Sequence, residues 1–336
     1  MTMDIDLPLL WAGLIAFAIL AYVVLDGFDL GVGILFPLVK DEDHRGTMMN
    51  SVAPVWDGNE TWLVLGGGGL FAAFPLAYAV LMPAFYAPVI AMLLALVFRG
   101  VAFEFRFRAT RLRPLWDLAF AGGSALAALC QGVMLGAFVQ GLAVEGRAYA
   151  GGWFDWLSPF SLFTGVALVL GYALLGAGWL ILKTEGALQQ RIYRLARPLA
   201  AAVVALIVGV SIWTPLLDAT IADRWFAWPN IVLVAPVPVL VAVAAGLLWW
   251  SLVRQRERWP FLVSLGLFVL SYIGLAISLF PYIVPRSVTI WAAAAPDSSL
   301  AFMLVGAAIL LPVILGYTSY VYWIFRGKVD SSAGYH

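Results

Sequence analysis

The stretch Val24–Leu35 reads VLDGFDLGVGIL, and the stretch Met48–Leu63 reads MMNSVAPVWDGNETWL. Together they place two pairs of acids, Asp26/Asp29 and Asp57/Glu60, in sequence that is otherwise almost wholly apolar. Each pair is spaced i, i+3, so its two members share one face of a helix. An ionisable side chain at the centre of a bilayer costs about 2.5–3.5 kcal/mol on insertion scales, and such residues usually mark ion or proton pathways. These four acids are therefore the candidate functional residues.

The composition surrounding these acids is that of a membrane protein. Of the 336 residues, 63% are hydrophobic and only 11% are charged, whereas soluble domains carry roughly 25% charged residues. The formal net charge is zero, which gives no indication of a nucleic-acid partner. The first residues, MTMDID, lack the basic segment that begins a cleavable signal peptide. We expect an all-α integral membrane protein.

Apolar runs of about 20 residues, the length needed to cross a bilayer, predict nine transmembrane helices. Their ranges are 8–36, 53–74, 79–103, 117–143, 159–183, 198–216, 229–252, 260–281 and 299–325. The second helix is the difficult one, because its apolar run, Trp62 to Phe74, is too short to cross. A span ending at Phe74 before Pro75 would begin near position 55 and place Asp57 and Glu60 in the membrane or at its edge. The alternative is a re-entrant half-helix that begins near Trp62.

The basic residues indicate the orientation. Of 19 Lys and Arg, 15 fall in the connections after the odd-numbered helices, and the even-numbered connections hold only Arg147, Arg224 and Arg286. The positive-inside rule then places the odd-numbered connections and the C-terminus in the cytoplasm. We expect the N-terminus on the outer side of the membrane. A bias this strong also favours an odd number of helices.

A weak internal repeat suggests how the helices are grouped. Residues 25–33 read LDGFDLGVG and residues 170–178 read LGYALLGAG, which align without a gap at a distance of 145 residues. The repeat predicts two four-helix bundles, residues 1–145 and 146–282, followed by a peripheral ninth helix and cytoplasmic tail in residues 283–336. Chance similarity is the alternative, because the chain is rich in Gly and Leu.

Ligands for a redox centre are scarce in this sequence. The two histidines, His44 and His336, both lie outside the predicted spans, and the single cysteine, Cys130, is best interpreted as a packed thiol. Haem, copper and di-iron sites draw on His, Met or Cys from the helices. No GxxxxGK[ST] motif of an ATP-driven pump is present. The chain is therefore expected to hold no metal itself, so any electron transfer would need a partner that binds the cofactor.

The depth of the acids allows two interpretations. Asp26 and Asp29 lie about 27 Å along the first helix from Pro8, near the level of Asp57 and Glu60 on the second helix. Carboxylates grouped at one depth and open to the cytoplasm predict an entrance for protons. A purely structural role is the alternative: the helix dipole stabilises acids in a first turn, and Arg99 is an available ion-pair partner. Trp56 and Trp62, which flank the second pair, are typical packing residues.

The same segments resemble subunit II of the cytochrome bd-type quinol oxidases. The resemblance rests on VLDGFDLGVGIL, on WDGNETWL with the following GGGGLFAAFP, on FRGVAFEFR at 98–106, and on LFPYIVPRSVTIW and LGYTSYVYWIF near the end. It implies a haem-free subunit with two four-helix bundles and a peripheral helix. It also implies a partner, subunit I, that holds haem b and haem d and reduces dioxygen to water with electrons from quinol. Some members have a third small single-helix subunit, a structural quinone in subunit II or insensitivity to cyanide, and the sequence decides none of these.

Residue roles follow from the resemblance only where the motifs match. Asp57 corresponds to the acid of the WDGN motif, which is implicated in a proton path toward the haems, and Asp26 and Asp29 correspond to the DGFD acids. Trp62 corresponds to a tryptophan near the mouth of a proposed oxygen tunnel. Some relatives have His where this chain has Val55, and some have Gln where it has Glu60, which weakens any inference about those two positions. Arg99 and Trp56 are expected to pair and pack beside the acids.

Two further functions remain as alternatives from the residues alone. A proton-coupled secondary transporter would use the repeat and the glycine run Gly66–Gly69 for alternating access. A pure assembly scaffold would use all four acids structurally.

Overall fold

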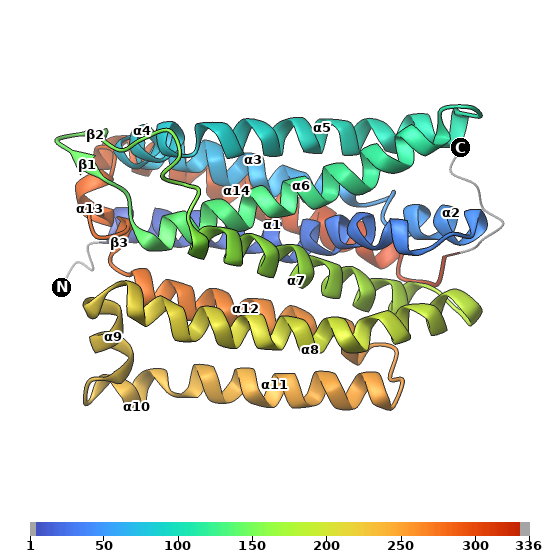
Figure 1. Cartoon of the computed structure of the whole chain (residues 1–336). Coiled ribbons are helices and arrows are strands. Elements are labelled where there is room, and N and C mark those ends of the chain that lie inside the picture. Colours follow the sequence, from blue (N-terminus) through green and yellow to red (C-terminus); the bar gives the residue numbers. More distant parts are fainter. Residues whose placement is uncertain (1–4, 330–336) are drawn as a thin grey trace.

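The computed structural model describes residues 5–329. His336 and the end of the predicted cytoplasmic tail lie outside these residues. Within these residues, nine long helices run roughly side by side (Figure 1). They are α1 (Leu7–Leu35), α3 (Trp56–Ala73), α5 (Tyr86–Arg108), α6 (Arg113–Gln140), α7 (Pro159–Lys183), α8 (Gly186–Leu217), α11 (Pro236–Val253), α12 (Trp259–Leu279) and α14 (Asp297–Ile324).

Short elements close the two ends of this array. At one end lie η1 (Phe36–Leu38) and α2 (Glu42–Asn50), which follow α1 (Figure 1). The opposite end holds α4 (Pro75–Ala84), α9 (Ala219–Phe226), α10 (Asn230–Val234), α13 (Ile290–Ala293) and two small antiparallel hairpins. The hairpins are β1 (Val144–Glu145) with β2 (Ala148–Tyr149), and β3 (Tyr282–Val284) with β4 (Val288–Thr289).

The all-α membrane class is confirmed, whereas the count of nine spans is not. Eight helical stretches of the described chain are long and apolar enough to cross a membrane, and α3 is not among them. The helix itself begins at Trp56, after a turn at 51–55, and ends at Ala73. The alternative of a half-helix that begins near Trp62 is therefore wrong, because the helix already includes Asp57 and Glu60 and begins near position 55, as predicted for a full span.

Prolines explain where the predicted boundaries were wrong. The range 79–103 was predicted as one helix, but the chain breaks at Phe85 between α4 and α5. Pro88 accounts for the break, because it has no N–H to donate and its ring would clash with the carbonyl of Ala84 in a continuous helix. The range 229–252 is likewise divided at Ala235, directly before Pro236.

The helix predicted at 198–216 begins twelve residues earlier, at Gly186, and contains Pro198 in its interior. A search for apolar runs missed this extension because it carries three arginines. Its buried residues Leu188, Ile192 and Ala196 recur at helical spacing, which is the pattern of an amphipathic helix. In contrast, α7 matches its predicted range 159–183 exactly. Its start is fixed by a reciprocal capping box between Ser158 and Ser161.

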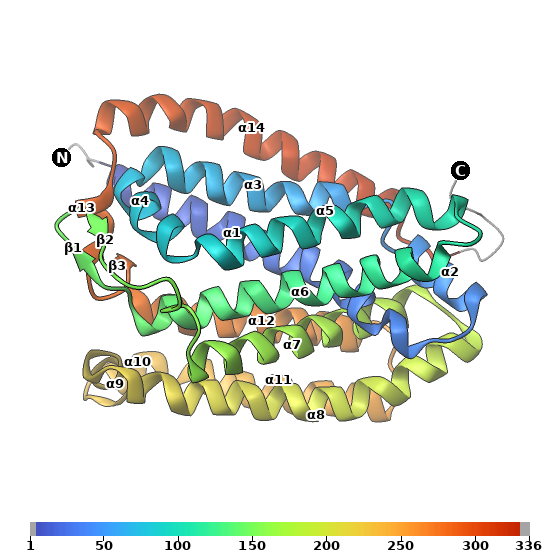
Figure 2. The ribbon, with the colours of Figure 1, turned by 45° about the horizontal axis from the view of Figure 1, so that its top comes forward.

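The helices of both predicted halves share one apolar core. A continuous cluster of buried side chains runs from Phe28 on α1 through Phe103 on α5 and Leu175 on α7 to Leu267 on α12. Helix α1 packs against both α6 and α7 and so connects the two sets of helices. Helix α14 lies at the edge of the array beside α3 and α1 (Figure 2). The division into two bundles at residue 145 stays a prediction.

Candidate functional site

The centre of the candidate site is Arg99, a fully buried arginine on α5. Its Nη1 donates a hydrogen bond of 2.6 Å to Glu60 Oε1 on α3, and its Nη2 lies 3.5 Å from Asp26 Oδ1 on α1. One guanidinium thus connects an acid of each sequence pair. The side chain of Glu60 is 23% exposed, whereas Asp26 is completely buried.

Two aromatic rings, those of Trp56 and Phe103, pack against the guanidinium of Arg99. Trp56 stacks on Phe103 with ring centroids 4.8 Å apart and an interplanar angle of 9°. The guanidinium carbon of Arg99 lies 5.8 Å and 5.6 Å from these two ring centroids, within the range of cation–π attraction. The expected neighbours Trp56 and Arg99 are therefore brought together.

Asp29 has a different partner from the other acids. Asn59 Nδ2 on α3 donates to Asp29 Oδ2 at 2.6 Å and to the carbonyl oxygen of Leu25 at 3.2 Å. The hydroxyl of Tyr322 on α14 then donates to Asn59 Oδ1 at 3.0 Å. Three helices are joined through one amide. The sequence analysis missed Asn59 and Tyr322, although a buried amide between Asp57 and Glu60 in an apolar helix was the available signal.

Asp57 is the acid of this group that faces outward. Its side chain is exposed, and its Oδ1 accepts a 2.7 Å hydrogen bond from the backbone N–H of Gly58. The N-cap position of α3 belongs to Val55, so Asp57 sits in the first turn and does not cap the helix. Within residues 5–329 it forms no ion pair with a basic side chain.

A second polar chain begins one turn from Asp26. Tyr22 lies four residues before Asp26 and therefore on the same face of α1. Gln131 Nε2 on α6 donates to the Tyr22 hydroxyl at 2.7 Å, and the Tyr172 hydroxyl on α7 donates to Gln131 Oε1 at 2.8 Å. These residues extend the polar interior away from α3. Sequence reasoning missed them because isolated Tyr and Gln occur commonly as packing residues.

Several buried polar atoms of the site have no hydrogen-bond partner in the described chain. They are both carboxylate oxygens of Asp26, Oδ1 of Asp29, and Nε and Nη2 of Arg99. At 3.5 Å, the contact between Arg99 and Asp26 is electrostatic rather than a hydrogen bond. Arg99 contacts Asp26 and Glu60, and Asp29 is bonded to an uncharged amide, so acidic side chains outnumber basic ones at this site.

Trp62 lies outside this polar group. It is 1% exposed, meets Phe17 edge-on at a centroid distance of 5.7 Å, and packs with Ala18, Ala21 and Tyr22. Its indole Nε1 has no partner among the described residues. The surroundings of Trp62 are therefore almost entirely apolar.

A second group of ion pairs lies at the end of the molecule that holds α2, where it links α2 to α5 and α6. Arg106 on α5 donates to Asp117 Oδ1 on α6 at 2.5 Å and to Glu42 Oε2 on α2 at 3.0 Å. Arg45 also donates to Asp117, at 2.9 Å. Both acids in this group, Glu42 and Asp117, have an arginine partner. The group is therefore a structural network that holds α2 against the ends of α5 and α6.

Comparison with known proteins decides the family. The family model for cytochrome bd terminal oxidase subunit II matches residues 7–325. The chain belongs to this family. It is 30% identical to subunit 2 of cytochrome bd-I ubiquinol oxidase from Escherichia coli over 96% of this chain and 95% of the relative. It is also 30% identical to subunit 2 of cytochrome bd ubiquinol oxidase from Bacillus subtilis, over 96% of each chain.

A solved structure shows the same fold. The bd oxidase of Geobacillus thermodenitrificans superposes with a TM-score of 0.74 at 19% identity, covering 96% of this chain and 99% of that one. With eight apolar helices long enough to span a bilayer, a subunit II of the bd oxidases is a multi-pass inner-membrane protein. It is part of an oxidoreductase complex with a subunit I. The family excludes the transporter alternative.

The bd oxidase complexes contain haem, so the residues of this subunit II were tested against a haem site. No three His, Cys, Asp or Glu side chains in residues 5–329 converge as they would around a metal ion. His44 lies on α2 beside Asp41, in the connection between helices, and Cys130 is packed in the core. The interior polar site offers carboxylates and a guanidinium, which are not haem ligands. The interior polar site around Arg99 therefore does not fit a haem.

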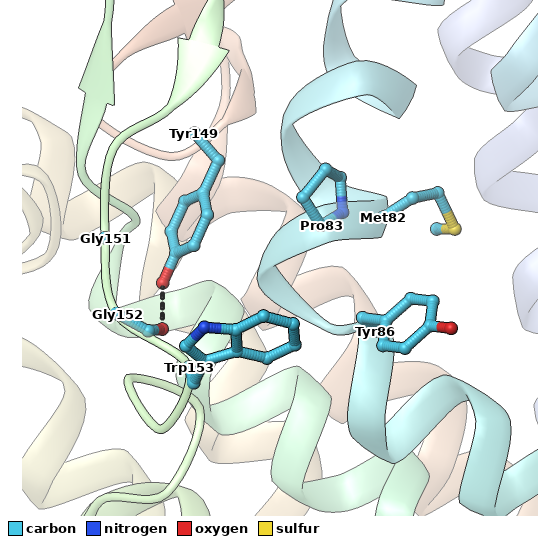
Figure 3. A pocket seen from close by; sticks show the side chains of 7 residues that line it. All are labelled: Met82, Pro83, Tyr86, Tyr149, Gly151, Gly152 and Trp153. Carbon is cyan, nitrogen blue, oxygen red and sulfur yellow. Dashed lines mark hydrogen bonds between the residues drawn. The ribbon is translucent and has the colours of Figure 1, made fainter.

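A hollow of about 410 Å³ lies at the other end of the molecule, between α4 and the loop that follows β2. Figure 3 shows Tyr149 and Trp153 on one side of it, and Met82, Pro83 and Tyr86 on the other. The Tyr149 hydroxyl donates to the carbonyl of Gly152 at 2.9 Å. None of the lining residues is acidic, so this hollow is not an extension of the Arg99 site.

Proposed function

We propose that this subunit leads protons from the aqueous phase at Asp57, past Glu60 and Arg99, to Asp26 and Asp29. The protons serve the reduction of dioxygen to water by the haem-bearing subunit I with electrons from quinol. The observation that supports this function is the arrangement of the acids: an exposed carboxylate stands next to a partly exposed one, which is bonded to a buried arginine beside buried acids.

The charge balance of the interior supports this proposal. Two carboxylates, those of Asp26 and Glu60, share one guanidinium, and the carboxylate of Asp29 has only an amide as its partner. An isolated ionised carboxylate in a dry interior is strongly unfavourable. Such a group of acids is neutralised by binding a proton. Since buried polar groups are nearly always hydrogen-bonded, the free oxygens of Asp26 and Asp29 favour ordered water between them. Water and protonated carboxyls together are the elements of a proton relay.

The open face of α3 is the proposed contact with subunit I. A Cβ placed on Gly67 or Gly68 would meet nothing within 4 Å. Val64 and Phe71, on the same helix, are 72% and 61% exposed. Glycines allow two membrane helices to approach closely. Because Asp57 is exposed at the first turn of this helix, a partner docked here would lie beside the proposed entrance.

The proposed entrance opens to the cytoplasm. Asp57 is in the first turn of α3, and α3 begins on the side of the molecule that holds α2 and the arginine-rich connections (Figure 1). The positive-inside rule assigns that end to the cytoplasm. The N-terminus is then periplasmic and the C-terminus cytoplasmic.

The decisive experiment replaces Asp57 with Asn in the assembled oxidase. We expect oxygen consumption per haem to fall at least about tenfold, in the range lost when a positioned proton-transfer group is removed, while the haem spectrum is unchanged. Asp43→Asn is the matched control, because Asp43 is an exposed acid on α2 that forms no ion pair within residues 5–329. Normal turnover in Asp57→Asn would refute the route. Loss of assembled complex with normal turnover per haem would show that the acid is structural, as in the scaffold alternative.

An oxygen route past Trp62 is a separate proposal. Its support is the almost wholly apolar environment of this side chain, the kind of surroundings in which small apolar molecules bind without water. Replacing Trp62 with Phe should change the KM for dioxygen and leave the KM for quinol unchanged. Equal KM values for dioxygen in both proteins would exclude the route.

A further inference from the structure

An apolar hollow separates two neighbouring helices far from Arg99. Helices α8 and α11 lie side by side at the outer edge of the array (Figure 1), and a hollow of about 380 Å³ remains between them. Its size is within the range of small-molecule pockets, about 300–1,000 Å³. The lining residues include Ala200, Ala201, Val204 and Ala205 from α8 and Ala245 and Trp249 from α11. Small side chains on both helices leave this space open.

Arg197 closes one end of this groove. It lies one helical turn before Ala200 and Ala201, on the same face of α8. Its Nη2 donates a 3.4 Å hydrogen bond to the carbonyl of Leu252, which is one turn beyond Trp249 on α11. Its Nε is buried and has no hydrogen-bond partner among the described residues. The guanidinium therefore links α8 to α11 at this end of the groove, which we call the groove mouth. At least its Nε–H has no acceptor among the described residues.

The basic residues at this mouth have no acidic partners. Arg194 is one turn before Arg197, and Arg254 directly follows α11; both are exposed. Within residues 5–329, none of these three arginines has a carboxylate oxygen within 4.0 Å. Glu257, in the loop after α11, is already bonded to Lys328 at 2.9 Å and to Gln189 at 3.0 Å. The mouth thus carries an uncompensated positive charge.

Aromatic residues place the mouth at the surface of the bilayer. Trp249 and Trp250 are 50% and 43% exposed, and the guanidinium of Arg256 lies 5.9 Å from the Trp250 ring centroid. Exposed tryptophans beside arginines at a helix end are typical of the headgroup level. The apolar groove extends from there into the hydrocarbon region.

We infer that the groove between α8 and α11 binds one anionic phospholipid, with an acyl chain along Ala201 and its phosphate on Arg197. Basic pockets between transmembrane helices bind the headgroups of anionic lipids, and a guanidinium matches the geometry of a phosphate. The unmatched arginines favour this occupant over an apolar helix of a partner, which would leave their charges uncompensated. The site is independent of the proposed proton route.

Native mass spectrometry of the complete oxidase, stripped of lipid in a neutral detergent, tests this inference. Titration with phosphatidylglycerol should give one lipid bound at least about tenfold more tightly than phosphatidylcholine. In Arg197→Gln that preference should fall about tenfold, and Arg197→Lys should restore part of it, because a Lys contacts phosphate as a point charge. Arg111→Gln, which alters an exposed arginine of the α5–α6 connection, is the matched control.

The groove itself is tested by filling it. Ala201→Leu should weaken phosphatidylglycerol binding, whereas Ala242→Leu, at an exposed alanine of α11 outside the lining, should leave it unchanged. A haem spectrum like that of the wild type will show that each variant assembles. Equal affinity for the two lipids, or equal loss in Arg197→Gln and Arg111→Gln, would overturn the inference. Loss of a co-purifying protein in Ala201→Leu, with lipid binding retained, would also overturn it.

Discussion

Gly31 on α1 and Gly176 on α7 meet where these two helices cross. A Cβ on Gly31 would lie 1.8 Å from the carbonyl oxygen of Tyr172, and a Cβ on Gly176 would lie 2.3 Å from the carbonyl carbon of Gly31. The two glycines occupy equivalent positions in the segments 25–33 and 170–178. Contact between equivalent residues is what two parallel repeats related by an axis along the membrane normal would produce. The contact has the geometry that such a repeat would give, and the repeat itself stays a prediction.

We expect Gly31→Ala to disrupt the crossing of α1 and α7. The new methyl group would clash with backbone atoms, which cannot turn away as a side chain can, and overpacking of this kind costs about 1–3 kcal/mol or more. The yield of haem-loaded oxidase and its melting temperature should both fall. Gly13→Ala on the same helix is the control, because nothing lies within 4 Å of its Cβ position. Equal stability of the two variants would contradict the close contact.

The fold class and the acidic residues of the candidate site could be predicted from the sequence. The residues that bond to those acids could be predicted only in part. Hydropathy indicated the spans, because a segment that crosses the bilayer needs a long apolar run. It did not identify α3 as a span, because the first turns of that helix are polar. The ends of α5 and α8 were misplaced because Pro88 breaks a helix whereas Pro198 lies inside one. Local sequence alone does not separate these cases.

The candidate site was predictable only in its charged members. Asp26, Asp29, Glu60 and Arg99 stood out because ions are rare in apolar helices. Asn59, Tyr322 and Gln131 are polar but uncharged, and their importance comes from tertiary contacts across 30, 263 and 109 residues of sequence, respectively. Such partners become visible only when the helices are placed side by side.

Arg99→Gln tests whether the arginine holds the acids together. Breaking a buried ion pair by removing one partner costs about 3–5 kcal/mol, because the remaining charge is uncompensated. We expect little assembled oxidase from this variant. Adding Glu60→Gln should recover part of the yield, since it removes one of the acids left without a partner. Arg108→Gln, at a side chain that is 83% exposed, should assemble normally. A normal yield in Arg99→Gln would show that the acids are neutral without it.

Tyr322→Phe removes the hydroxyl that connects α14 to Asn59. A hydrogen bond of this kind contributes about 0.5–1.5 kcal/mol, so the melting temperature should fall slightly and assembly should be retained. Asn59 would then lose the contact that orients its amide toward Asp29. Turnover per haem should therefore fall clearly even though the melting temperature changes little. Tyr320→Phe is the control, because Tyr320 is 58% exposed on the same helix. Identical turnover in the two variants would mean that the orientation of Asn59 does not matter.

The last prediction concerns pH and a contact at the opposite end from Asp57. Hydrogen bonds from the Thr220 hydroxyl and backbone N–H, at 2.6 Å and 2.7 Å, together with Arg286 at 2.7 Å, lower the pKa of Asp218 from its usual 3.8. A group with a lowered pKa contributes stability above its unfolded pKa and loses it as the pH falls through the folded pKa. Asp218→Asn should therefore melt below the wild type by a constant interval between pH 7 and pH 5.

That interval should shrink below about pH 4, where the unfolded Asp218 is largely protonated. Asp223→Asn, at an exposed acid in the same short helix α9 that forms no ion pair within residues 5–329, should melt like the wild type throughout. Melting curves followed by circular dichroism in buffers of constant ionic strength would measure both variants. An interval that stays the same down to pH 3 would show that the charge of the Asp218 carboxylate does not stabilise α9, because the ionised form accepts these hydrogen bonds more strongly and only it attracts Arg286.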